Sequence, residues 1–203
     1  MVYNNIQCRE GLSFPAYLEL PGYSHSFLKS QVQGVPKAFT PTARMQLGTL
    51  VDEIQTGRAD LSHPDYPKAR RIASALQLKF GDALRAFKTQ ASLSAEVEHG
   101  GLIMPVKGRP DYLIRNMMVL DLKVTSGGCT RKSAPMETKI AALHKLIDFM
   151  GYDNQLWNYG QMSGARLYFI LYYSVPLDEC FVLQRFCEGA QAWWEEKVLM
   201  FGS

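Results

Sequence analysis

Residues 108–125 read GRPDYLIRNMMVLDLKVT and contain two short apolar runs separated by Asn116. In the second run, residues 118–125, one face is entirely apolar, whereas the other carries Asp121 and Lys123. This alternation is typical of a β-strand. Asparagine tolerates a positive φ, so we expect the two runs to form a hairpin that turns at Asn116. Asp111 and Asp121 each lie five residues from that turn, so the hairpin places them opposite each other.

This pairing would bring two acids and a base together. Asp121 and Lys123 share one strand face, about 7 Å apart along the strand. Directly opposed residues have Cβ atoms about 5 Å apart, so two ionised carboxylates there repel unless a cation lies between them. Carboxylate oxygens suit Mg²⁺ or Mn²⁺. The alternative for an Asp-x-Lys strand is a solvated face with a weak ion pair.

The remaining pattern predicts a mixed α/β domain, with helices flanking a central sheet. Residues 1–22 show no clear period, and we expect residues 1–203 to form a single domain. The expected helices cover residues 24–29, 39–57, 64–88, 136–162 with a break at Gly151, and 188–201. The expected strands cover residues 91–99, 102–106, 109–114, 118–125, 166–174 and 180–186.

Composition narrows the function classes only a little. The chain has 203 residues and a net charge of +3, which neither indicates nor excludes nucleic-acid binding. The four cysteines form no C-x-x-C pair, which argues against a zinc or iron–sulfur site. The first residues lack a signal-peptide pattern, and the longest apolar stretch is too short to span a bilayer. We therefore expect a cytoplasmic protein without membrane contact.

Two helical segments add polar groups to the predicted site. Gln155 and Tyr159 lie four residues apart, so they share a helix face and could contact a phosphate. Asp52 places a carboxylate on an earlier helix. The plainer interpretations are a partly buried tyrosine at a helix boundary and an ordinary surface aspartate.

Four short motifs occur in a fixed order: GTLVD at 48–52, GRPD at 108–111, LDLK at 120–123 and QLWNY at 155–159. In that order they resemble the motifs of the PD-(D/E)XK nuclease superfamily. More narrowly, they resemble its RecB-like branch, which includes phage exonucleases of the RecE and lambda exonuclease kind. Asp52 departs from the pattern because the family has histidine there. An aspartate can also bind a divalent cation.

The resemblance implies a restriction-endonuclease-like core and a Mg²⁺- or Mn²⁺-dependent deoxyribonuclease, more an exonuclease of phage or prophage recombination than an endonuclease. The implied catalytic residues are Asp111, Asp121 and Lys123, with Lys123 orienting or deprotonating the attacking water. The implied metal ligands are Asp111, Asp121, the carbonyl of Leu122, Asp52 and Glu98. The residues implied to contact DNA or support the site are Gln155, Tyr159, Arg109, Arg131 and Lys132; for the last two, a mobile polar loop is the alternative.

The implied partners are double-stranded DNA with a free end, further copies of the chain in a ring, and a single-strand annealing protein. Two rival functions stay open. One is a relative that binds nucleic acid without cutting it. The other is a cysteine hydrolase using Cys129 with His144, although no activating pattern surrounds that cysteine.

Overall fold

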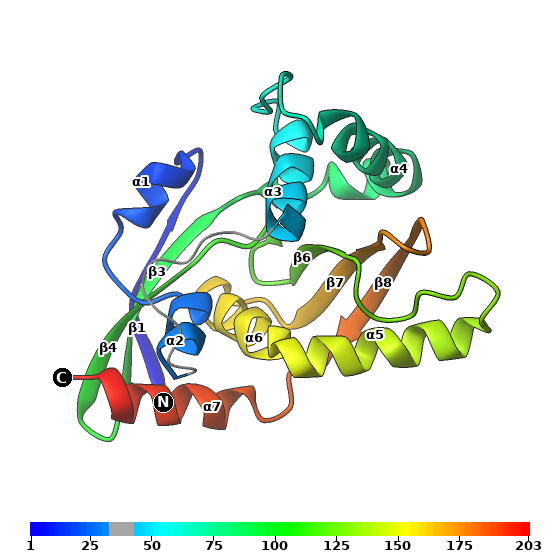
Figure 1. The fold of residues 1–203 in the computed structure, drawn as a ribbon. Coiled ribbons are helices and arrows are strands. Elements are labelled where there is room, and N and C mark those ends of the chain that lie inside the picture. Colours follow the sequence, from blue (N-terminus) through cyan, green and yellow to red (C-terminus); the bar gives the residue numbers. More distant parts are fainter. Residues whose placement is uncertain (33–42) are drawn as a thin grey trace.

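The computed structural model describes residues 1–32 and 43–203 (Figure 1). The predicted mixed α/β class is confirmed, and the strands are divided between a mixed five-stranded sheet and a three-stranded antiparallel sheet. The predicted start of the second helix, at residues 39–42, lies outside the described residues. Within them, no helix is long and apolar enough to cross a membrane.

The five-stranded sheet has the order β2-β5-β6-β7-β8. Its strands are β2 (Lys88–Thr89), β5 (Tyr112–Ile114), β6 (Met118–Thr125), β7 (Leu167–Ser174) and β8 (Glu179–Arg185). Only β6 and β7 pair in parallel, and the other neighbours are antiparallel. Parallel neighbours need a crossover connection, which α5 (Met136–Met150) and α6 (Tyr152–Ser163) provide.

The three-stranded sheet has the order β1-β3-β4, formed by β1 (Val2–Arg9), β3 (Ser92–His99) and β4 (Leu102–Gly108). The sequence did not predict β1. Six of its eight residues are exposed, so no alternation of apolar side chains marks it. Its pairing with β3 is also interrupted between Asn4 and Gln7, and Asn5 has a φ of 52°.

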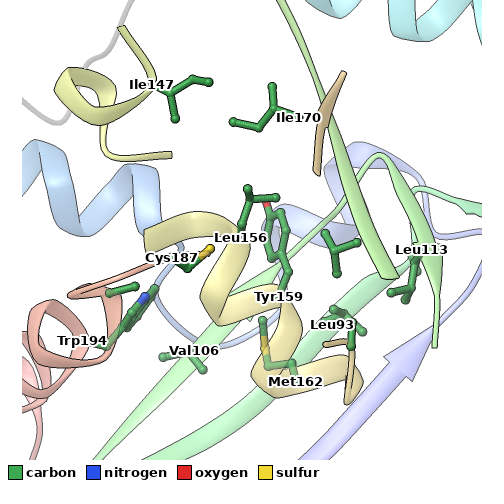
Figure 2. Close-up of a cluster of buried hydrophobic side chains, with 14 of the residues drawn as sticks. Leu93, Val106, Leu113, Ile147, Leu156, Tyr159, Met162, Ile170, Cys187 and Trp194 are labelled. Atoms are coloured by element: carbon green, nitrogen blue, oxygen red, sulfur yellow. The ribbon is translucent and has the colours of Figure 1, made fainter. Parts of the chain in front are cut away.

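Helices cover both faces of β6. Besides α5 and α6, the helices are α1 (Phe14–Leu18), α2 (His25–Val32), α3 (Ala43–Gln55), α4 (Tyr66–Leu84) and α7 (Ala190–Phe201). Leu120 and Leu122 pack into a core with α3 and α4. Val119 faces a second, larger core, in which Tyr159 of α6 lies among buried side chains (Figure 2). Asp121 faces the same side as Val119 and is only 2% exposed, so the strand does not present it to solvent.

Candidate active site

The hairpin has the predicted register. Tyr112 pairs with Leu120, and Ile114 pairs with Met118. Asn116 turns the chain with a φ of 59°. β5 begins at Tyr112, three residues later than predicted. Pro110 lies in the segment that was expected to be strand, and it has no N–H to donate to a β-ladder. Asp111 therefore lies just before β5, at the position that continues the register toward Asp121.

A hydrogen bond ties Asp111 to the other strand. Its Oδ2 accepts a 2.7 Å hydrogen bond from the main-chain nitrogen of Leu122, between Asp121 and Lys123. Burial raises the pKa of Asp111 well above its ordinary value, and the charges of Asp121 and Asp52 raise it further. The two predicted acids thus share one low-dielectric site and repel each other.

Lys123 forms an ion pair with Asp121, and its Nζ lies 4.7 Å from the centre of the Tyr152 ring. Burial works to lower the pKa of Lys123, but Asp121, Tyr152 and Asp111 together outweigh it, so the pKa is raised above its ordinary value. In the arrangement described, Lys123 is therefore an ammonium group held between an acid and an aromatic face.

Asp52 is drawn into the same site. Burial raises its pKa to about 6; Arg109 opposes that rise, whereas Glu53 and Asp121 add to it. The Asp52 carboxylate accepts a hydrogen bond from Nε2 of Gln90. Asp52, the residue at which the sequence departs from the nuclease motif, thus interacts with the predicted catalytic acids.

The predicted helix pair also reaches the site. Nε2 of Gln155 donates a 2.6 Å hydrogen bond to the hydroxyl of Tyr159, which is buried. Burial raises the pKa of Tyr159 well above its ordinary value, and the charge of Asp121 raises it further. A Cβ on Gly108 would lie 2.4 Å from Cε1 of Tyr159, so the tyrosine ring rests directly on the first residue of the GRPD motif.

Gln90 is a site residue that the sequence did not reveal. Its Oε1 accepts a 2.6 Å hydrogen bond from Nη2 of Arg109, while its Nε2 donates to Asp52. Its main-chain nitrogen donates a 3.0 Å bond to the carbonyl of Asp111. Gln90 has a φ of 51°, a conformation that costs energy in a non-glycine residue and is often found at functional sites. A lone glutamine between β2 and β3 gives no sequence signal for this role.

A polar cavity of about 290 Å³ opens beside Gln90. Both Arg58 and Arg109 line it, which gives it positive charge. Nη2 of Arg109 donates to the carbonyl of Leu12 at 3.0 Å, whereas Nε and Nη1 are buried without a hydrogen-bond partner in the described residues. The other lining residues are Gly11, Leu12, Gln55, Thr56, Thr89 and Gln90.

One predicted ligand lies far from the acids, and two predicted DNA contacts lie on an exposed loop. Glu98 lies exposed in β3, five residues along the strand from Leu93, the partner of Gly108. At the usual rise that separation is about 16 Å, which puts Glu98 too far away to bind the same ion as Asp111 and Asp121. Arg131 and Lys132 are exposed on the loop between β6 and α5, and Nε of Arg131 donates to Ser133 at 3.3 Å.

The cysteine and histidine of the rival hydrolase interpretation have separate partners. Sγ of Cys129 lies 3.7 Å from the carbonyl oxygen of Arg131. The His144 ring instead contacts the guanidinium of Arg185, which also binds Asp148 and Asp153. This arrangement gives Cys129 no activating base.

The donor set suits a cation that needs few protein ligands. Within residues 1–32 and 43–203, no three His, Cys, Asp or Glu side chains are clustered closely enough to form a complete metal cage. Mg²⁺ commonly uses one or two carboxylates and keeps several waters. Oδ2 of Asp121 is buried and makes no hydrogen bond in these residues beyond its ion pair with Lys123. The carboxylates of Asp111 and Asp121 repel each other, and Oδ2 of Asp121 can bind a cation. These two features fit Mg²⁺ or Mn²⁺.

No protein-family model matches this sequence, and no curated protein matches it either. One solved structure, described as a "putative exonuclease" from Eubacterium rectale, is 15% identical, with a TM-score of 0.60 over 89% of this chain and 73% of that one. This likeness establishes a shared fold and is consistent with the expected restriction-endonuclease-like core. A second structure, of the protein SSO0001, is 16% identical over 85% of this chain and 82% of that one, but its TM-score of 0.39 is too low to support an inference.

Proposed function

We propose that this chain is a metal-dependent deoxyribonuclease that hydrolyses phosphodiester bonds, with exonuclease action favoured over endonuclease action. One observation carries the proposal: Asp111 accepts a hydrogen bond from the main-chain nitrogen of Leu122, next to Asp121, and the Asp121 carboxylate is paired to the Lys123 ammonium. The shared fold with the structure described as a "putative exonuclease" supports it.

Asp111, Asp121 and the carbonyl of Leu122 would hold Mg²⁺ or Mn²⁺, with Asp52 as a further candidate ligand. Bound there, the ion would polarise the scissile phosphate and lower the pKa of the attacking water. It would also relieve the repulsion that raises the pKa of Asp111.

Lys123 would stabilise negative charge on the phosphate in the transition state. Lys123 would also orient the attacking water or accept a proton from it. Tyr152 and Asp121 hold the ammonium in place from two sides.

Other residues would position the DNA. Arg109 and Arg58 line the polar cavity and offer charge to a backbone phosphate. Gln155 and Tyr159 support the GRPD segment through the contact on Gly108. Arg131 and Lys132 would contact DNA farther from the reacting bond. By the motif resemblance alone, we also propose a role in phage or prophage recombination, a homo-oligomeric ring and an annealing-protein partner.

The test is to incubate linear and circular duplex DNA with the protein in Mg²⁺, in Mn²⁺ and in EDTA. We expect linear DNA to shorten from its ends only when a divalent ion is present, while circles stay intact. Nicked circles would indicate an endonuclease. No cutting with either ion would overturn the proposal and favour a relative that binds nucleic acid without cleaving it.

A further inference from the structure

A second cavity, of about 200 Å³, is lined by residues of α2, α6 and α7. Figure 1 shows where these three helices lie. His25 and Lys29 of α2 line it, as do Gly151, Asn154 of α6 and Trp193 of α7. The rings of His25 and Trp193 form one wall, with centres 5.1 Å apart and planes tilted by 51°, and Nζ of Lys197 lies over the Trp193 ring at 5.3 Å from its centre. None of these residues takes part in the site described above, and the motif comparison assigns them no role. We name this cavity the α2–α7 pocket.

The floor of the α2–α7 pocket presents polar atoms to an occupant. A Cβ built on Gly151 would lie 3.5 Å from Nδ2 of Asn154 and 3.8 Å from Nε2 of His25, so both nitrogens lie beside the space that this glycine leaves open. His25 is 5% exposed, and in the described residues its Nε2 has no hydrogen-bond partner. A buried polar atom without a partner is costly, and a ligand that bonds to it would remove that cost.

His25 is electrically neutral in this setting. Burial lowers the pKa of His25 to about 3, and the nearby charges of Lys29 and Lys123 lower it further. A neutral imidazole can donate or accept one hydrogen bond at Nε2. The pocket therefore offers a hydrogen-bonding floor and an aromatic wall. The ammonium of Lys29 is anchored to the carbonyl of Met150 at 2.7 Å.

The pocket adjoins the proposed catalytic site. Tyr152, whose ring faces the ammonium of Lys123, directly follows Gly151 in the chain. The charge of Lys123 also contributes to the lowered pKa of His25. A DNA strand whose scissile phosphate lies near Lys123 could thus reach this pocket with a neighbouring nucleotide.

We infer that the α2–α7 pocket holds an unstacked nucleobase of the substrate strand, next to the phosphate that is cut. This inference rests on the proposed nuclease function. The base stacks on Trp193, and its polar edge bonds to His25 Nε2 and Asn154 Nδ2. Every base has an aromatic face and a polar edge, which match the wall and the floor. A purely apolar side chain of a protein partner would leave His25 Nε2 unpaired.

The rim of the pocket allows a mild test. Phe149 lines the pocket and is 81% exposed, so Phe149→Ala removes apolar surface from the rim with little effect on folding. Phe186 is 77% exposed and is not part of the lining, so Phe186→Ala is the matched control. Asn154→Ala removes one floor atom, and Trp193→Ala removes the wall.

The experiment measures fluorescence anisotropy with a short fluorescein-labelled thymidine oligomer and with an abasic oligomer of equal length. Both titrations use Ca²⁺ as the divalent ion, and gels verify that the strands stay uncut. We expect the wild type to prefer the thymidine oligomer, and Trp193→Ala to reduce that preference about tenfold, the effect of one stacked base. Asn154→Ala and Phe149→Ala should reduce it less, and Phe186→Ala should leave it unchanged.

Separate outcomes test the two claims. Binding without a base preference, or a preference that survives both Trp193→Ala and Asn154→Ala, would overturn the pocket assignment while the nuclease proposal stands. The pocket would then suit a protein partner instead. If the wild type bound neither oligomer and cut no DNA, the proposed function itself would fail. If Trp193→Ala does not fold, Asn154→Ala still decides the outcome.

Discussion

Asp111 accepts a hydrogen bond from the main chain of Leu122 across the turn of the central hairpin, at 2.7 Å. This bond holds the Asp111 carboxylate against Leu122, the residue between Asp121 and Lys123. It also lies one residue beyond the last ladder pair, where Tyr112 faces Leu120. The geometry holds two like charges close together, and the consequences for stability differ between the two acids.

Asp111→Asn should stabilise the metal-free protein by about 1 kcal/mol, because it removes one of two opposed like charges. The asparagine Oδ1 can still accept the bond from Leu122. Asp121→Asn should instead destabilise the protein by about 2 kcal/mol, because it leaves the partly buried Lys123 ammonium without its ion-pair partner. Urea unfolding in EDTA measures both changes, and equal shifts in the same direction would contradict the asymmetry.

The stability of the metal-free protein should depend on pH through Asp52. Its pKa is about 6, against an ordinary value of 3.8, so its stabilising contribution is complete below about pH 4 and is lost as the pH rises through about 6. Relative to Asp52→Asn, the wild type should lose about 2–3 kcal/mol over that range. Unfolding curves at a series of pH values test this. Parallel stability profiles for the two proteins would show that Asp52 is not perturbed.

Gln90→Ala should lower DNA cleavage about tenfold or more, because it releases both Asp52 and Arg109 from one anchoring side chain. The fold should be retained, since Gln90 lies outside both hydrophobic cores. Cleavage rates at several Mg²⁺ concentrations measure the effect. Gln77→Ala, on the exposed part of α4, is the control. Equal rates for both variants would remove Gln90 from the site.

Gly108→Ala should destabilise the protein by about 1–3 kcal/mol, because the new methyl group would overlap the ring of Tyr159. Gly48→Ala is the matched control. Its Cβ would meet only Val124 Cβ at 3.9 Å, and alanine in a helix is favoured over glycine by about 1 kcal/mol. Thermal unfolding of both variants decides the point. A Gly108→Ala protein as stable as the wild type would mean that Tyr159 does not pack on the GRPD segment.

The sequence predicted the central hairpin well because two local signals agreed. The alternation over residues 118–125 set which side chains share a face, and Asn116 set the turn, so the register followed from these two features alone. The placement of Gln155 and Tyr159 on one helix face was predictable for the same reason, because helical spacing is a local property; their hydrogen bond to each other was not predicted.

The features that sequence reasoning missed depend on contacts between distant segments. β1 is mostly exposed and lacks an apolar period, so only its pairing with β3 defines it as a strand. Glu98 follows the alternation of β3 but lies far along the strand from Asp111 and Asp121. The number of residues between motifs in the sequence does not give that distance in space. The role of Gln90 arises only where α3, β2 and the GRPD segment meet.

The most direct test of the proposed chemistry compares the wild type with Lys123→Met in two assays on linear duplex DNA: cleavage in Mg²⁺ and binding by anisotropy. The substitution keeps a side chain of similar length and removes the charge. We expect DNA binding to persist and cleavage to fall at least about 100-fold, since the ammonium acts on charge that develops in the transition state. If the Lys123→Met protein digested DNA at the wild-type rate, the hairpin would not be the catalytic site.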